Sequence, residues 1–253
     1  PVIAAFGSQE LKERFLPKTK SCEIWWSQGF SEPDAGSDLA SLRTTAVREG
    51  DEYVVNGQKT WTTLGQFGDW IFTLVRTDPS ADKPQKGISF LLIDMSSPGL
   101  TVRPIKLIDG RHEVNEVFFD DVRVPADQLV GEENRGWDYA KFLLGNERTS
   151  AAPVGSIKAA LAAAKEHAKA TRSPHGTALD EPLLAARFAQ LEAEVMALEL
   201  TVLRVAGDSR DGRPDPASSI LKLRGSQLQQ DVYELMVDVA GVDALTWYTG
   251  EWG

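Results

Sequence analysis

Cysteine is almost absent from this chain of 253 residues, which contains only Cys22. A disulfide within the chain is therefore excluded, and this usage favours a reducing, cytoplasmic setting. We expect Cys22 itself to be a small buried hydrophobe. Long apolar runs are missing as well, since none approaches the ~20 residues that would span a bilayer. The sequence also opens without a basic-then-apolar leader segment.

An excess of basic residues is lacking too. The chain has 27 Lys and Arg against 37 Asp and Glu, so its net charge is −10, which argues against a nucleic-acid-binding surface. A small anionic ligand remains possible, because a local cluster of Arg can bind a phosphate on an acidic protein. His112, His167 and His175 lack metal-ligand spacing, so we expect no metal site. The apolar fraction of 42% suffices for a core in one large domain or two small ones.

The stretch from residue 42 to residue 125 has a β pattern. Apolar runs at 53–55, 70–75 and 88–93 are typical of strands, and 100–105 and 116–124 are predicted to be strands as well. Asn56-Gly57 predicts a hairpin turn with a return strand over 58–63, because both residues tolerate positive φ. Several short strands at this spacing predict an antiparallel barrel or sandwich.

Helical patterns lie on both sides of this stretch. Ser8 is predicted to cap a short helix that ends at Pro17. Longer helices are predicted over 137–171, with a kink near Pro153, and over 181–208 and 216–239. Three helices leave an open face that another helix or subunit would close. The predicted fold class is α+β, with a short helical N-terminal remnant (1–22), a middle β domain (23–130) and an α-helical bundle domain (131–253).

A small polar loop precedes the strands, and residues 28–38 read Gln-Gly-Phe-Ser-Glu-Pro-Asp-Ala-Gly-Ser-Asp. Backbone N–H groups of 36–38 can face an anion, and Ser37 adds a hydroxyl donor. Ser31 can offer a hydrogen bond to the edge of a heterocycle. A loop that caps a helix through Ser37 or Asp38 is the simpler interpretation of the composition alone.

A second motif ends the predicted hairpin, where residues 59–63 read Lys-Thr-Trp-Thr-Thr. Side chains alternate along a strand, so Trp61 and Thr63 are predicted to share one face. A ring and a hydroxyl on one face could stack on a planar cofactor and hydrogen-bond to it. An ordinary core Trp beside a surface Thr is the alternative.

Together these motifs resemble the acyl-CoA dehydrogenase family, with further matches at 118–125 (Phe-Phe-Asp-Asp-Val-Arg-Val-Pro) and at Glu147-Arg148. The sequence at residues 110–113, Gly-Arg-His-Glu, is similar to that of actinobacterial-type members. The resemblance implies an FAD enzyme with three domains, of which this chain would lack most of the first and the end of the last.

The resemblance also implies contacts for each matching position. Ser31 would contact the flavin pyrimidine, Ser37 the FAD diphosphate and the CoA thioester, and Trp61 one face of the isoalloxazine. Thr63 would reach flavin N5, Arg148 the CoA channel and Arg172 the FAD, although the pattern after Arg172 departs from the family's. The whole set assigned to the cofactor is Gln28, Phe30, Ser31, Ser37, Trp61, Thr62, Thr63 and Arg172.

The reaction that the resemblance implies is α,β-dehydrogenation of an acyl-CoA, in which a carboxylate removes the α-proton and a hydride passes to flavin N5. Glu147 is the candidate base, because some family members carry this Glu just before an Arg. The alternatives are a surface Glu at this position and a base beyond Gly253. The implied partners are an acyl-CoA, an electron-transfer flavoprotein and further subunits in a homo- or hetero-oligomer. Two other readings stay open, namely a flavin-poor partner subunit and a related flavin oxidase or monooxygenase.

Overall fold

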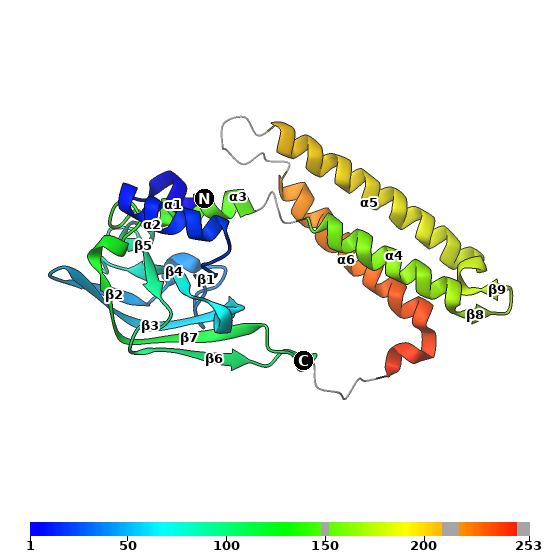
Figure 1. Cartoon of the computed structure of the whole chain (residues 1–253), viewed down its shortest axis with the longest axis horizontal. Helices are drawn as coiled ribbons and strands as arrows, with labels where there is room; N and C mark the ends of the chain where they lie inside the picture. Colours follow the sequence, from blue (N-terminus) through cyan, green and yellow to red (C-terminus); the bar gives the residue numbers. More distant parts are fainter. Residues whose placement is uncertain (148–151, 209–217, 247–253) are drawn as a thin grey trace. The chain divides into compact units, whose positions relative to one another are not determined.

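The computed structural model describes residues 1–147, 152–208 and 218–246 and divides into two compact units, Pro1–Leu143 and Leu144–Gly253. The first unit holds a seven-stranded sheet with short helices, and the second is helical (Figure 1). The expected α+β class is confirmed. None of the described helices is both long and apolar enough to cross a membrane.

The sheet has the strand order β1-β4-β2-β3-β7-β6, with β5 on the free side of β4. Most neighbours are antiparallel, but β1 pairs with β4 in parallel, and so does β2 through Thr45 and Arg76. The sheet is therefore mixed, a detail that the expected antiparallel barrel did not include. Its strands are β1 (Trp26–Gly29), β2 (Thr45–Glu49), β3 (Glu52–Thr63), β4 (Trp70–Arg76), β5 (Ile88–Asp94), β6 (Leu100–Ile105) and β7 (Val114–Pro125).

The predicted hairpin at Asn56-Gly57 is wrong. The turn lies at Gly50 and Asp51, between β2 and β3, and β3 runs without interruption through Asn56 and Gly57. At this point the β3–β7 register shifts, because Asn56 exchanges two hydrogen bonds with Asp121 instead of joining the ladder. Gly57 has φ +147°, so the positive φ that predicted a turn serves a β-bulge instead.

One buried cluster of the first unit lies on one face of the sheet, where residues from different strands meet. Alternate side chains along β4 and β5 point into it, among them Ile71, Val75, Leu91 and Ile93, and none of these four is exposed. The opposite face of β5 is buried as well, since Phe90 and Leu92 are also inaccessible, so this strand is covered on both sides. The ring of Phe72 on β4 lies next to that of Trp26 on β1 and stacks on that of Phe90 on β5.

Two short helices open the first unit, α1 (Val2–Phe6) and α2 (Gln9–Lys20). Ser8 caps α2 as predicted, since its Oγ accepts a hydrogen bond from the Leu11 N–H. Pro17 does not end α2, which continues to Lys20, and Thr19 Oγ1 donates to the Phe15 carbonyl at 2.7 Å. Cys22 follows in a turn with φ +60° and is exposed, so its expected burial is wrong.

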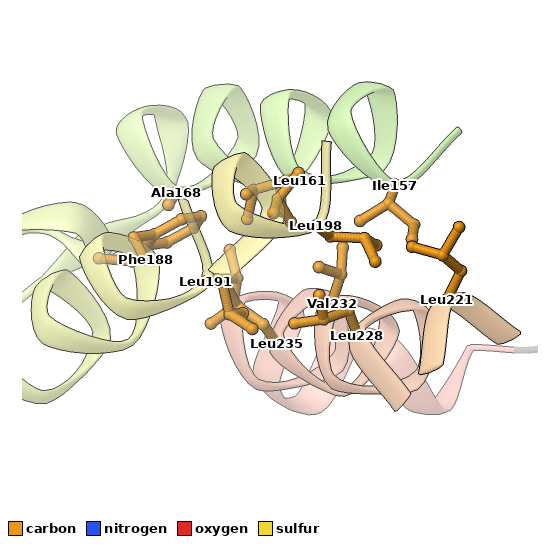
Figure 2. Packing of buried hydrophobic residues seen from close by; sticks show 14 of the residues in the cluster. Ile157, Leu161, Ala168, Phe188, Leu191, Leu198, Leu221, Leu228, Val232 and Leu235 are labelled. Atoms are coloured by element: carbon orange, nitrogen blue, oxygen red, sulfur yellow. The ribbon is translucent and has the colours of Figure 1, made fainter. Parts of the chain in front are cut away.

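The helices that follow the sheet are α3 (Gly136–Glu147), α4 (Val154–Ala170), α5 (Pro182–Asp208) and α6 (Ser218–Ala240). A small hairpin of β8 (Arg172–Ser173) and β9 (Gly176–Thr177) joins α4 to α5. The predicted kink near Pro153 falls beside residues outside the described ranges. Figure 2 shows how buried residues of α4, α5 and α6 point toward one another, for example Leu161, Phe188 and Val232. Short 3-10 helices complete the described chain: Leu39–Ser41, Gly65–Phe67, Pro84–Gly87, Ala126–Gln128, Ala178–Asp180 and Gly241–Leu245.

Candidate functional site

The polar loop and the end of β3 lie next to each other in the first unit. The Thr60 N–H donates to the Ser31 carbonyl at 2.9 Å, which joins the two sequence motifs directly. Phe30 is buried, while Ser31 is half-buried beside it. The structure therefore brings together the two motifs that the sequence analysis singled out.

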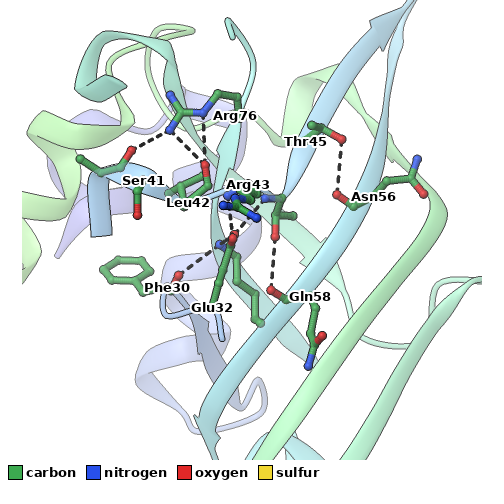
Figure 3. A network of polar contacts seen from close by, with 12 residues as sticks. Phe30, Glu32, Ser41, Leu42, Arg43, Thr45, Asn56, Gln58 and Arg76 are labelled. Carbon is green, nitrogen blue, oxygen red and sulfur yellow. Dashed lines mark hydrogen bonds and ion pairs between the residues drawn. The ribbon is translucent and has the colours of Figure 1, made fainter. Parts of the chain in front are cut away.

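A buried ion pair holds this junction. Lys59 Nζ lies 2.7 Å from Glu32 Oε1 and also donates to the Phe30 carbonyl at 3.1 Å. The same carboxylate accepts hydrogen bonds from the backbone N–H groups of Arg43 and Thr44, at 2.6 and 2.9 Å (Figure 3). One carboxylate thus fixes both ends of the loop to the strand.

The charges in this pair respond to burial and to each other. Burial lowers the pKa of Lys59 from 10.5 to about 8, although the nearby Glu32 carboxylate opposes that shift. Burial alone would raise the pKa of Glu32, but the charge of Lys59 and the hydrogen bonds that Glu32 accepts outweigh it, so that its pKa is lowered. Both groups are therefore charged at neutral pH, and the ion pair persists in a buried site.

Arg76 holds the far side of the loop. Its guanidinium donates to the carbonyls of Ala40, Leu42 and Pro84, at distances from 2.6 to 3.2 Å. Figure 3 shows the contact with Leu42. Burial lowers the pKa of Arg76, and the three carbonyls satisfy the buried donors. Since Arg76 lies in β4, the loop is fixed to two strands of the sheet.

The end of β3 presents an aromatic ring to the outside. Trp61 is 59% exposed and has φ +59°, and the β3–β7 register shifts between Lys59 and Thr62. Thr62 is fully buried, whereas Thr63 is exposed like Trp61. A large exposed ring in a left-handed backbone is unusual. This bulge leaves Trp61 and Thr63 both exposed, as the predicted shared face requires.

Asn115 supports this strand end from β7. Its Nδ2 donates to the Thr62 carbonyl at 3.0 Å and to Gln66 Oε1 at 2.7 Å, and its side chain is fully buried. His112 Nε2 lies 2.6 Å from Asn115 Oδ1. Among the described residues, the hydroxyl of Thr62 is a buried group without a hydrogen-bond partner.

The polar loop is open to solvent near Gly36. A side chain at Gly36 would meet nothing within 4 Å, so the backbone there is open to a ligand, and Ser37 next to it is exposed. Asp38 precedes the short helix Leu39–Ser41 without capping it through its side chain. Asp38 therefore occupies the N-cap position that the simpler interpretation predicted, although its side chain makes no capping hydrogen bond. Gln28 is half-buried on β1, opposite Phe72 of β4.

Three predicted site residues belong to the second unit. Glu147 is the last residue of α3 and is exposed, and Arg172 is exposed on β8, where it pairs with Thr177. Arg148 lies outside the described residues. Each unit is described by itself, so the geometry around Trp61 concerns the first unit alone. In the described part of the chain, no three His, Cys, Asp or Glu residues are grouped to hold a metal ion.

Sequence reasoning missed the residues that hold the site together. Glu32 and Lys59 were both inside the two motifs, but their pairing depends on the fold. The available signal was a Lys directly before the run Thr-Trp-Thr-Thr at the end of the strand, because a charge among such side chains indicates a partner. Asn115 and Arg76 had no comparable signal.

Comparison with known protein families agrees with this architecture. The model of the acyl-CoA dehydrogenase middle domain matches residues 27–122, and that of the acyl-CoA dehydrogenase C-terminal domain matches residues 134–252. The chain belongs to the acyl-CoA dehydrogenase family.

Similar members of this family include proteins of known sequence and structure. Acyl-CoA dehydrogenase FadE26 of Mycobacterium tuberculosis is 38% identical over 251 residues, covering 96% of this chain and 62% of the relative. The ChsE4-ChsE5 complex from Mycobacterium tuberculosis aligns with a TM-score of 0.85 at 38% identity, over 97% of this chain and 64% of the matched one. A steroid acyl-CoA dehydrogenase, Tcur3481-Tcur3483, aligns with a TM-score of 0.88 at 28% identity, over 99% and 64%. The chain thus spans just under two thirds of the length of these acyl-CoA dehydrogenases.

Proposed function

We propose that this protein takes part in the FAD-dependent α,β-dehydrogenation of an acyl-CoA thioester, with Trp61 at the flavin ring. The observation that carries the proposal is the exposed Trp61 ring beside Thr63, on a strand end fixed to the Ser31 loop. Membership in the acyl-CoA dehydrogenase family supports the same chemistry.

In this proposal residues of the first unit, Pro1–Leu143, here called the β unit, bind and orient FAD, and the second unit, called the helical unit, adds Arg172. Trp61 would cover one face of the isoalloxazine ring, while the hydroxyls of Ser31 and Thr63 would donate hydrogen bonds to its polar edge. Ser37 would lie toward the diphosphate and the thioester, and Arg172 would add a positive charge toward the FAD. Gln28, Phe30 and Thr62 would complete the surrounding surface. When bound, the flavin supplies the hydride acceptor that no amino-acid side chain provides.

We assign the role of general base to Glu147. Its carboxylate would take the α-proton of the thioester, and Arg148 would hold the CoA portion nearby. Glu147 ends α3 and is exposed, which leaves it accessible to a substrate.

Replacing Glu147 by Gln in the purified protein tests this role, because the amide cannot take up the proton. Turnover should fall by about 10²–10⁴-fold while FAD stays bound, since general bases contribute this much. Glu166→Gln, at another exposed glutamate of the helical unit, is the matched control and should keep full activity. Retained activity in Glu147→Gln would contradict the assignment.

The cofactor proposal has a direct spectroscopic test. The purified protein, with added FAD, should show the two visible absorption bands of bound flavin, and Trp61→Ala should weaken FAD binding by roughly 10–100-fold through loss of stacking. Trp25→Ala is the control, because Trp25 is also exposed (47%) and belongs to the same unit. A wild-type protein that takes up no FAD would favour the flavin-poor partner subunit.

The acyl group is open within this proposal. Flavin bleaching under anaerobic conditions, against straight-chain, branched and steroid side-chain acyl-CoAs, identifies the substrate class. Bleaching that depends on a substrate other than a thioester would favour a related oxidase or monooxygenase. An electron-transfer flavoprotein would reoxidise the cofactor, and the single cysteine suits a cytoplasmic enzyme.

A further inference from the structure

The end of β3 bends at two positions that are close together. Trp61 and Leu64 have φ values of +59° and +51°, in the left-handed region that side chains other than glycine rarely adopt. Thr62 and Thr63 lie between them, and Thr62 is buried whereas Thr63 is exposed. Backbone of this kind persists only where neighbouring contacts fix it, and it is concentrated at sites that hold a ligand. The contacts that fix this bend therefore decide how Trp61 and Thr63 are presented.

Three polar side chains form a closed set of hydrogen bonds beside this bend. Asn115 Nδ2 donates to the Thr62 carbonyl at 3.0 Å and to Gln66 Oε1 at 2.7 Å. Gln66 Nε2 donates in turn to the His112 carbonyl at 3.1 Å, and His112 Nε2 lies 2.6 Å from Asn115 Oδ1. We call His112, Asn115 and Gln66 the Asn115 network. It meets β3 at a backbone group, the Thr62 carbonyl.

Two backbone carbonyls determine which atom donates in each of these contacts. A carbonyl oxygen can only accept, so the amide groups that face the Thr62 and His112 carbonyls are the NH2 groups of Asn115 and Gln66. Asn115 Oδ1 is left to accept, and His112 Nε2 therefore carries the hydrogen. The orientation of the Asn115 amide is thus set by His112 on its oxygen and by Gln66 on its nitrogen.

Asn115 occupies a position at which an apolar residue would be expected. In β7 it shares one face with Val117 and Phe119, and all three side chains are buried. A buried amide is costly unless its hydrogen bonds are made, and an apolar side chain of similar shape can serve stability equally well. A fully satisfied polar network instead fixes one arrangement of the groups that it contacts. The presence of Asn115 is therefore explained by the backbone that it orients.

The segment that contains Asn115 holds the chain on both sides of Thr63. The Leu64 N–H donates to the Glu113 carbonyl at 2.7 Å, next to the Asn115 contact with the preceding carbonyl. A Cβ at Gly65 would lie 3.3 Å from Asn115 Nδ2, so glycine allows the turn to approach the amide this closely. The exposed Thr63 side chain consequently extends from a backbone that is fixed before and after it.

We propose that Asn115, oriented by His112, is a positioning residue that presents Trp61 and Thr63 to the flavin. Asn115 acts through the Thr62 carbonyl and needs no contact with the cofactor. This role rests on the proposed function, since it concerns how the same flavin face is held.

Substitutions of His112 test this role, because His112 is exposed and its replacement leaves the core intact. Glutamine provides a donor near the position of Nε2 and leucine provides none. His112→Gln should therefore bind FAD within ~3-fold of the wild type, whereas His112→Leu and Asn115→Leu should bind it at least ~10-fold more weakly. The visible absorption bands of bound flavin should shift in the two leucine variants but not in His112→Gln, because the hydrogen bonds to a flavin tune its electronic state.

Asn56→Leu is the matched control for both measurements. Asn56 also joins β3 to β7, through two hydrogen bonds with Asp121, but it lies at the other bulge. This variant should leave the affinity for FAD and the positions of the absorption bands unchanged. Equal affinities and equal bands in His112→Leu and His112→Gln would overturn the positioning role.

Hydrogen exchange of the FAD-free protein measures the bend without the cofactor. The amide hydrogens of residues 62–67 should exchange at least ~10-fold faster in His112→Leu and Asn115→Leu than in the wild type, His112→Gln and Asn56→Leu. Unchanged exchange in both leucine variants would overturn the positioning role. A wild type that takes up no FAD would overturn the proposed function and its flavin, whereas faster exchange in the leucine variants would still support Asn115 as the residue that fixes the bend.

Discussion

The Lys59→Met variant examines the pair that fixes the loop to the strand. Methionine keeps much of the length of the side chain but removes the charge and all donors. The ammonium group is fully buried and contacts Glu32 Oε1 and the Phe30 carbonyl. Breaking a buried ion pair by removing one partner costs about 3–5 kcal/mol, because the remaining charge is left unpaired. The two backbone N–H groups that still bind the Glu32 carboxylate place the expected loss near the lower value, ~3 kcal/mol.

This loss can be measured on the β unit alone. Five of the seven tryptophans, at positions 25, 26, 61, 70 and 137, belong to that unit, so most of the tryptophan fluorescence follows its unfolding. A loss of ~3 kcal/mol should lower the melting temperature by roughly 6–12 °C, at about 2–4 °C per kcal/mol. Lys169→Met, at an exposed lysine of α4, is the control and should change stability by less than ~0.5 kcal/mol.

A double-mutant cycle separates the energy of the Lys59–Glu32 interaction from the effects of the two substitutions taken singly. Lys59→Met combined with Glu32→Gln should lose less than the two single losses added together, since no unpaired charge remains. A Lys59→Met protein within ~1 kcal/mol of the wild type would refute the reasoning, which places an interaction of about 3 kcal/mol or more at this site. Additive losses in the cycle would refute it too.

Four further outcomes follow from the same region. Folding lowers the pKa of Lys59 from 10.5 to about 8, so between these pH values the unfolded state binds more protons than the folded state. The free energy of unfolding, measured by urea titrations at several pH values, should therefore rise as the pH increases from 8 to 10.5. A fall over this range would contradict the burial of the Lys59 charge. The lowered pKa of Glu32 acts at the other end, where stability should be lost as the pH falls below 4.5. Gly57→Ala should cost at least ~2 kcal/mol in the same assay, because its Cβ would lie 2.6–2.8 Å from Thr44 atoms at a φ of +147°, and a neutral result would refute the tight bulge. Thr62→Val should stabilise the FAD-free protein by about 1 kcal/mol, since it removes a buried hydroxyl without a partner among the described residues; a destabilised variant would reveal a hydrogen bond to that hydroxyl.

The helices were largely predictable from the sequence because their signals are local. The helix over 181–208 was predicted from its apolar periodicity, and Phe188, Leu191, Val195 and Leu198 are buried in the bundle core. Pro17 was misleading, since a proline inside a helix costs stability but packing can outweigh it. Its helix continues for another turn, with Thr19 bonded to the Phe15 carbonyl.

The sheet was less predictable, because its pairings are not local. Asn56-Gly57 has the composition of a hairpin turn, but β3 is long enough to pair with β7 on both sides of it. The real turn at Gly50 and Asp51 has a weaker signal and connects the strands that have the complementary register. A bulge and a turn need the same positive φ, so composition alone could not distinguish them.

The candidate site was predictable where a residue faces outward and not where it acts through another residue. Trp61 and Ser37 were singled out because a ring at a strand end and a hydroxyl in a glycine-bearing loop are chemically distinctive, and both are exposed, while their role at a cofactor stays a prediction. Lys59 and Glu32 lie 27 residues apart, and their contact arises only when the loop folds back on the strand. A sequence states which groups are present, whereas their partners follow from the topology.

This division of the chain has a consequence for how its proposed activities depend on one another. The Ser31 loop and the Trp61 strand end are held as one piece by Lys59, Glu32 and Arg76, all within the β unit. Glu147 belongs to the helical unit and shares none of these contacts in the described part of the chain. Changes to Lys59 or Trp61 should therefore alter FAD affinity, whereas Glu147→Gln should alter turnover at unchanged FAD affinity. A Glu147→Gln protein that loses its flavin would show that Glu147 itself contributes to FAD binding, beyond the contribution proposed for Arg172 of the same unit.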